Sequence, residues 1–145
     1  MIRAKFFICS ESAALDARLN TLSAFHIMEQ LNAPAFPVVV PRLAILSLLE
    51  RDEGDPAVVQ LHLRMFSGVQ QLFDGPMPVN FNQQFSARTI IDMHGVVIPA
   101  PGELRFLLMN VEETLASWTI VVNNVGQAGA QLYFPPPPPP APANR

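Results

Sequence analysis

Apolar and polar residues alternate along most of the first 122 residues, and this period of two constrains the fold more than any other feature. The clearest case is Ala57–Phe66, where apolar and polar side chains take turns. Such alternation is typical of strands with one face in a core and the other in water. About eight segments of this kind recur at roughly 10–15-residue spacing, with turn-forming residues between them. The pattern predicts an all-β domain, specifically an antiparallel β-sandwich of about eight strands.

Two segments depart from this alternation. Leu19–Leu31 fits the spacing of a helix as well as that of a strand, and periodicity alone does not decide between them. Val38–Leu49 is apolar on both faces, which indicates a strand that is covered on both sides or meets another subunit. Because Pro41 cannot donate a hydrogen bond to a neighbouring strand, we expect an edge or a bulge there.

Turn-forming residues set the predicted boundaries of the other strands. Ser10–Arg18 is polar and rich in alanine, and we expect it to be a connection after a first strand, Ile2–Cys9. Asp74–Pro76 is predicted to be a turn, and Val79–Phe85 the strand that follows it. The residues expected in the core, all on apolar faces of strands, are Leu61, Leu63, Phe106, Trp118 and Ile120.

The composition indicates one domain with apolar surface to spare. The chain has 145 residues, half of them apolar and only 14% charged, whereas soluble domains average about 25% charged residues. With so few polar side chains to cover the apolar ones, some apolar surface is expected to face a partner, and a homo-oligomer would account for this. We place the β-sandwich domain at residues 1–122 and a Gly/Asn linker with a proline-rich tail at residues 123–145.

The tail contains six consecutive prolines, Pro135–Pro140, and is predicted to be disordered, or a polyproline II rod where it orders. Such rods are ligands for aromatic grooves. Three large apolar residues stand just before the prolines, and we expect them to dock on the domain, on another copy or on another protein. The candidate partner contacts are Leu132, Tyr133, Phe134, Pro135 and Pro136.

Several classes of function are disfavoured by charge and composition. The net charge is −3 and the basic residues are scattered, which argues against nucleic acid as a partner. The single cysteine, Cys9, provides neither a disulfide framework nor a cysteine zinc cluster, and we interpret it as a small buried apolar residue. The apolar stretches are too short for a secretory signal or a membrane span, so we expect a cytoplasmic protein without membrane contact.

Catalytic and metal-binding patterns are not evident in the sequence. His26, His62 and His94 fall on three different predicted strands, and no pair has a short metal-ligand spacing. The carboxylates of Glu50–Asp55 could bind calcium, but their spacing differs from that of an EF-hand, and a solvated turn is favoured. Nucleophile-elbow, phosphate-loop and dinucleotide-binding motifs are also missing. We therefore expect no enzyme, no cofactor and no metal.

A few short motifs resemble an uncharacterised bacterial family of small proteins. They are the Leu-Asn-Thr-Leu-Ser-Ala-Phe segment Leu19–Phe25, Phe36-Pro37, the strand Val38–Leu49, and Pro101-Gly102, together with Cys9 at the end of the first strand. The resemblance covers roughly residues 4–122. It implies a β-sandwich of unknown function without catalytic residues to carry over, and it favours a strand for the ambiguous segment after residue 19.

Together, these observations favour a non-catalytic binding or assembly module that acts through protein contacts, with itself or with another protein. Two alternatives remain open: a small hydrolase-like enzyme whose site is assembled by the fold, and a structural component of a larger particle, phage-like or secretory. A cleft holding a histidine beside a carboxylate would favour the enzyme. A flat apolar patch or an exposed edge strand would favour assembly.

Overall fold

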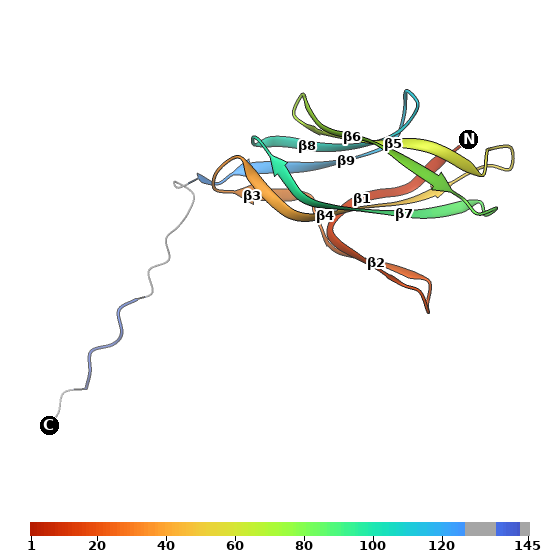
Figure 1. Ribbon diagram of the computed structural model, residues 1–145. Helices are drawn as coiled ribbons and strands as arrows, with labels where there is room; N and C mark the ends of the chain where they lie inside the picture. The colour runs from red at the N-terminus through yellow and green to blue at the C-terminus, as the bar shows by residue number, and fades with distance from the viewer. Residues whose placement is uncertain (127–135, 143–145) are drawn as a thin grey trace.

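The structure is a computed structural model that describes residues 1–126 and 136–142. Residues 1–126 form nine strands in two sheets that pack face to face (Figure 1). The strands are β1 (Arg3–Asp16), β2 (Thr21–Ile27), β3 (Gln30–Ala33), β4 (Val38–Glu50), β5 (Val58–Ser67), β6 (Gln70–Asn80), β7 (Ser86–Ile98), β8 (Gly102–Asn110) and β9 (Glu113–Asn124). One sheet has the order β2-β1-β4-β7 and the other β3-β9-β8-β5-β6. The predicted all-β sandwich is confirmed, with one parallel pair, β3 and β9, among antiparallel ones.

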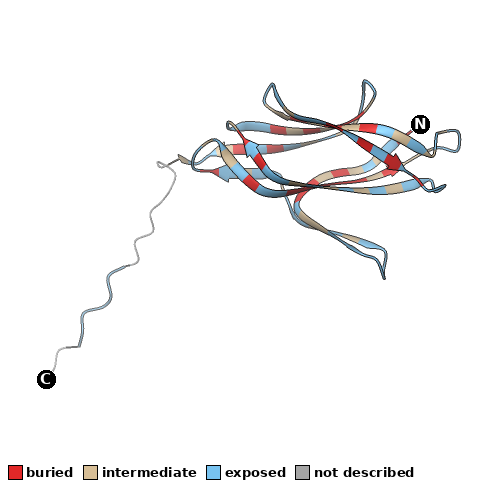
Figure 2. Cartoon of the chain, viewed as in Figure 1, coloured by how far each residue is buried: buried red, intermediate tan, exposed pale blue. Residues whose placement is uncertain are grey.

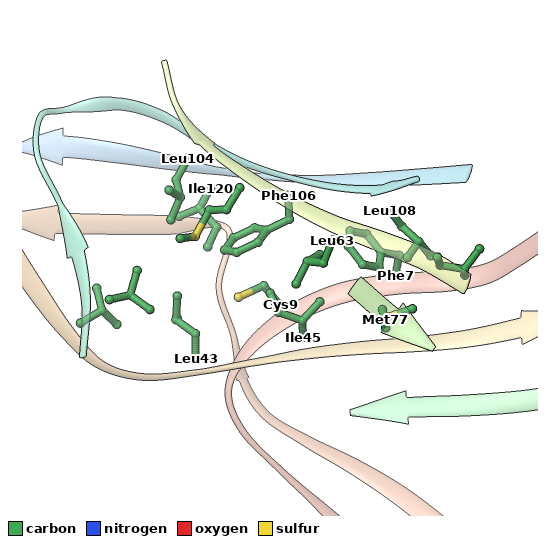
Figure 3. Packing of buried hydrophobic residues seen from close by; sticks show 14 of the residues in the cluster. Phe7, Cys9, Leu43, Ile45, Leu63, Met77, Leu104, Phe106, Leu108 and Ile120 are labelled. Carbon is green, nitrogen blue, oxygen red and sulfur yellow. The ribbon is translucent and has the colours of Figure 1, made fainter. Parts of the chain in front are cut away.

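The core lies between the sheets and is built by every second residue of the central strands (Figures 2 and 3). Phe106 of β8 points toward Cys9 and Ile45 of the facing sheet, as Figure 3 shows. Four of the five predicted core residues are at most 1% exposed: Leu61, Leu63, Phe106 and Ile120. Trp118 is only half-buried: it packs against the margin of the core, and its indole N–H donates a hydrogen bond to the Met28 carbonyl at 2.8 Å.

Strand β4 is an inner strand, between β1 and β7, and carries buried apolar side chains on both faces. Leu43 and Ile45 point into the core, while Leu46, on the opposite face, is also fully buried. Pro41 therefore does not mark a sheet edge. Instead, the β4–β7 register passes over Pro41 and the residue opposite it, Gly95, whose φ of 65° lies in the left-handed region that favours glycine.

The segment predicted to be a connection after the first strand is part of a long hairpin. Strand β1 continues to Asp16 and pairs with β2, and together they project from the body as an arm (Figure 1). Ser10–Arg18 can be polar and rich in alanine because backbone hydrogen bonds hold the two strands of this exposed hairpin together, and such bonds do not require apolar side chains. The ambiguous Leu19–Leu31 segment forms the strands β2 and β3, so the strand interpretation is confirmed.

Two predicted boundaries around β6 are wrong. Asp74–Pro76 is not a turn but lies within β6, which runs without a break to Asn80. The predicted strand Val79–Phe85 is instead the end of β6 and a reversal, because Asn82 and Gln83 adopt left-handed φ angles of 49° and 63°. This reversal carries the chain from one sheet to the other.

Candidate functional site

The two sheets of the described residues have four edge strands, β2, β3, β6 and β7. An edge strand exposes a row of backbone N–H and C=O groups that can pair with another chain, and proteins usually interrupt such rows. Strand β3 is only four residues long. Strand β2 is interrupted at His26, whose φ is 56° and which the β1–β2 register skips. Strand β6 carries Pro76 and Pro78.

The two prolines of β6 sit where they blunt its free edge. Phe81 N–H donates to the Ala57 carbonyl at 2.8 Å, one step beyond the β5–β6 register at Val58 and Asn80. In an antiparallel pair, opposed residues alternate between hydrogen-bonded and non-bonded pairs. The odd-numbered residues of β6 therefore bond to β5, and Pro76 and Pro78 face outward, where their missing N–H groups leave gaps in the edge.

The same reasoning shows which groups β7 presents at its free edge. Arg51 N–H donates to the Phe85 carbonyl at 2.9 Å, one step beyond the β4–β7 register. Ala87, Thr89, Ile91 and Met93 therefore bond to β4. The alternate residues Arg88, Ile90 and Asp92 direct their N–H and C=O groups away from β4.

This outward-facing triplet, Arg88, Ile90 and Asp92, has no proline, and the register around it is unbroken from Ser86 to His94. Among the described residues, no other edge is both as long and as regular. We call the triplet the β7 edge.

The side chains of the β7 edge lie on the outer face of their sheet. Ile90 is opposite Leu46, which is in turn opposite Ile8 of β1, so the three form an apolar row across the sheet. Leu46 is fully buried and Ile90 is 37% exposed, so the row reaches solvent at the edge.

The charged side chains of Arg88 and Asp92 lie on either side of this apolar row. The guanidinium of Arg42 lies 3.2 Å from the Asp92 carboxylate. Arg88 donates to the backbone carbonyl of Asn20, in the turn at the tip of the arm, at 3.0 Å.

A groove follows β7 on the side that faces β6, where the two sheets separate. It comprises cavities of about 630 and 450 Å³ lined mainly by apolar side chains, among them Met65, Leu72 and Ile91. Phe73 borders both cavities, and its ring lies so close over Gly75 that a Cβ there would stand 2.4 Å from the ring. Glycine at this position thus allows an aromatic side chain to occupy the open side of the sandwich.

The three histidines are not brought together. His26 contacts Glu11 on the arm at 2.6 Å, and His62 lies 3.5 Å from Asp74 on the other sheet. His94 lines the groove beside β7. A hydrolytic site assembled from several histidines is therefore not formed.

The groove itself offers a histidine and a carboxylate but no activated nucleophile. His94 is near Asp92 in sequence and both border the groove, yet the Asp92 carboxylate is paired with Arg42. Of the groove-lining side chains in the described part of the chain, only Thr89 has a hydroxyl, and it hydrogen-bonds to Ser47. Among these described residues, Thr89 therefore has no general base beside it that would activate it as a nucleophile in this arrangement.

The acidic turn predicted at Glu50–Asp55 contacts basic groups of Met1 and of strand β1. Asp52 and Asp55 lie 2.6 and 2.5 Å from the N-terminal ammonium of Met1, and Asp52 also pairs with Arg3 at 3.0 Å. Hydrogen bonding to the ammonium lowers the pKa of both carboxyl groups. Within residues 1–126 and 136–142, no three His, Cys, Asp or Glu side chains are grouped as a metal site would need.

Cys9 is fully buried in the core, and burial raises the pKa of its thiol to about 12. A thiol in this state is neutral and unreactive at physiological pH. The interpretation of Cys9 as a small apolar core residue is confirmed.

Of the partner contacts predicted in the tail, the structure describes only one. Leu132, Tyr133, Phe134 and Pro135 lie outside the described residues, and Pro136 is exposed. The β7 edge was not predicted as a site from the sequence. The described residues include no helix of the length and apolarity that crossing a bilayer requires.

The fold defines a small two-sheet β-sandwich in which β7 is an edge strand. The chain belongs to a family of unknown function, DUF6941, whose model matches residues 5–123. This membership confirms the small β-sandwich family of unknown function expected from the sequence.

Comparison with solved structures gives distant likenesses. The chain is similar to an immunoglobulin-like protein from Pseudomonas aeruginosa, with 12% identity, a TM-score of 0.46, and coverage of 85% of this chain and 97% of that one. It is also similar to part of a β-glucosidase from Listeria innocua, with 8% identity, a TM-score of 0.44, and coverage of 82% of this chain and 16% of that one. No curated protein matches the chain.

Proposed function

We propose that the chain is a non-catalytic protein-binding module that captures an extended segment of a partner as an additional strand along the β7 edge. The observation that carries this proposal is the contrast between the two edges on the open side of the sandwich. Strand β6 is blunted by Pro76 and Pro78, whereas Arg88, Ile90 and Asp92 of β7 present backbone groups that pair with no other strand of the described residues. Backbone pairing supplies affinity in strand addition, and side-chain contacts supply specificity.

The side chains beside the β7 edge favour a partner strand with an apolar centre. A strand placed next to β7 would extend the row that ends at Ile90 on one face. On the other face it would lie over the groove that Phe73 and Ile91 border. Burial of this apolar surface adds to the backbone hydrogen bonds. The hydrolase-like alternative lacks comparable support, because His94 stands in the groove without an activated nucleophile.

Site-specific photo-crosslinking in the cells that carry the gene tests this function. A photoreactive phenylalanine analogue at Ile90 should give protein adducts. The same analogue at Val121 should not, because Val121 is similarly exposed, at 43% against 37%, but lies on β9, an inner strand. Mass spectrometry of the adducts identifies the partner, whether a second copy or another protein. Equal labelling at both positions, or no protein adduct at Ile90, would contradict the proposal.

A further inference from the structure

We infer that the strand captured by the β7 edge is β7 of a second copy of the chain, paired antiparallel about a two-fold axis at Ile90. This inference rests on the proposed function and names its partner. It is carried by the order of residues along the edge, a basic, an apolar and an acidic residue at equal spacing: Arg88, Ile90 and Asp92. An antiparallel strand with the same order is complementary to it.

The backbone groups satisfy this arrangement. With Ile90 opposite Ile90 of the second copy, Arg88 stands opposite Asp92 of that copy, and Asp92 opposite Arg88. All three residues point their N–H and C=O groups away from β4, so each opposed pair is of the hydrogen-bonded type and exchanges two bonds. The pairing therefore leaves the β4–β7 ladder intact and continues its sheet across the axis.

The side chains fit the same register. Two reciprocal Arg–Asp pairs form across the strands on either side of the Ile90 pair when each Arg88 guanidinium turns from the Asn20 carbonyl and side-chain amide oxygens, which it contacts in the single chain. Opposite charges at such positions stabilise a sheet. The apolar row of Ile8, Leu46 and Ile90 meets its own copy at the axis and becomes continuous across both sheets. Asp92 keeps its contact with Arg42 at one oxygen, 3.2 Å away, and its other oxygen is available to the incoming arginine.

Other registers that also place outward-facing residues of the two copies opposite one another lose this complementarity. A shift that centres the axis on Arg88 opposes two guanidinium groups, and one that centres it on Asp92 opposes two carboxylates. The intermediate shifts place a charged side chain opposite Ile90. Charges at sheet edges commonly prevent pairing with another copy, but here the opposite signs, symmetric about Ile90, favour it.

Charge exchange tests the register directly. In Arg88→Asp the pair becomes two carboxylates, and in Asp92→Arg two guanidinium groups, so each variant alone should dimerise about 10-fold or more weakly than the natural chain. An equimolar mixture of the two variants should form a heterodimer, because each acidic edge then meets a basic one. The double variant Arg88→Asp/Asp92→Arg should recover self-association. Arg18→Asp, an exposed charge change on the arm, is the matched control and should leave the dimer unchanged.

Sedimentation velocity of the purified full chain across a wide concentration range measures these masses, with thermal melting as the check on folding. If a single variant melts too early to interpret, Ile90→Pro provides a second test, because it removes an edge N–H and should give a monomer. A natural chain that stays monomeric, a dimer indifferent to both charges, or a mixture that fails to associate would overturn the inference. A monomeric chain whose Ile90 still crosslinks to another protein in cells would overturn it while leaving the proposed function standing.

Discussion

Proline at position 91 should unfold or severely destabilise the chain, whereas proline at position 90 should be tolerated. Ile91→Pro removes an N–H that bonds to β4, leaves the carbonyl of Ile45 opposite it without a hydrogen-bond donor, and removes a half-buried side chain. Together these losses amount to about 3 kcal/mol or more. Ile90→Pro removes an N–H that faces outward, at a position like those of Pro76 and Pro78 on β6, so its cost should be about 1 kcal/mol.

Chemical denaturation followed by circular dichroism compares the two variants with the natural chain at a protein concentration low enough to exclude association. Both substitutions remove an isoleucine side chain, but Ile91 packs against the core and Ile90 is 37% exposed. The difference between Ile90→Ala and Ile91→Ala measures this side-chain contribution, and the remaining difference between the two proline variants reports the direction of the backbone groups. Similar losses of stability in Ile90→Pro and Ile91→Pro would show that the free edge has been assigned wrongly.

Truncation of the central aromatic side chain should have a comparably large effect. Phe106 is fully buried between the sheets, and Phe106→Ala should lower the free energy of unfolding by about 3–5 kcal/mol through lost apolar burial and the cavity that remains. For a domain of this size the melting temperature should fall by roughly 10–20 °C. The matched control is Phe85→Ala, because Phe85 is 57% exposed.

Thermal melting of both alanine variants checks this expectation. The Phe85 ring lies beside the Arg51 guanidinium, 5.2 Å from it, so Phe85→Ala should cost about 1 kcal/mol at most. An effect of Phe106→Ala no larger than that of Phe85→Ala would mean that the sheets do not pack about Phe106.

Alternation along the chain was sufficient to predict the β-sandwich and most of its core. It works because an inward-facing residue such as Leu63 repeats every second position in any half-buried strand. Alternation did not predict the strands whose residues are determined by something other than side-chain burial. Asp74–Pro76 contains residues typical of turns, yet it continues β6, because Gly75 accommodates the Phe73 ring and Pro76 lies where no ladder bond is needed.

The β7 edge could not be predicted from the sequence, and the reason is physical. Whether Arg88, Ile90 and Asp92 offer free backbone groups depends on which strand ends the sheet and on the parity of its pairing with β4. Both properties follow from contacts between residues far apart in the chain. The expectation that the low charge leaves apolar surface for a partner stays a prediction. Val38–Leu49 was expected to be covered on both sides or to meet another subunit, and the structure buries Leu46 on the outer face but leaves Val39 57% exposed. The symmetric charge order about Ile90 was visible in the sequence, but it acquires meaning only once β7 is known to be an edge.

Residue-resolved amide hydrogen exchange along β7 tests the central claim most directly. In dilute protein, the amides of Ala87, Thr89 and Ile91 should exchange slowly, because they bond to β4, and those of Arg88, Ile90 and Asp92 should exchange as exposed groups do. In concentrated protein, the second set should become protected as β7 pairs with its copy. Uniform protection of both sets in dilute protein, or exposed-type exchange at Ile90 at every concentration despite a dimeric mass, would contradict the account.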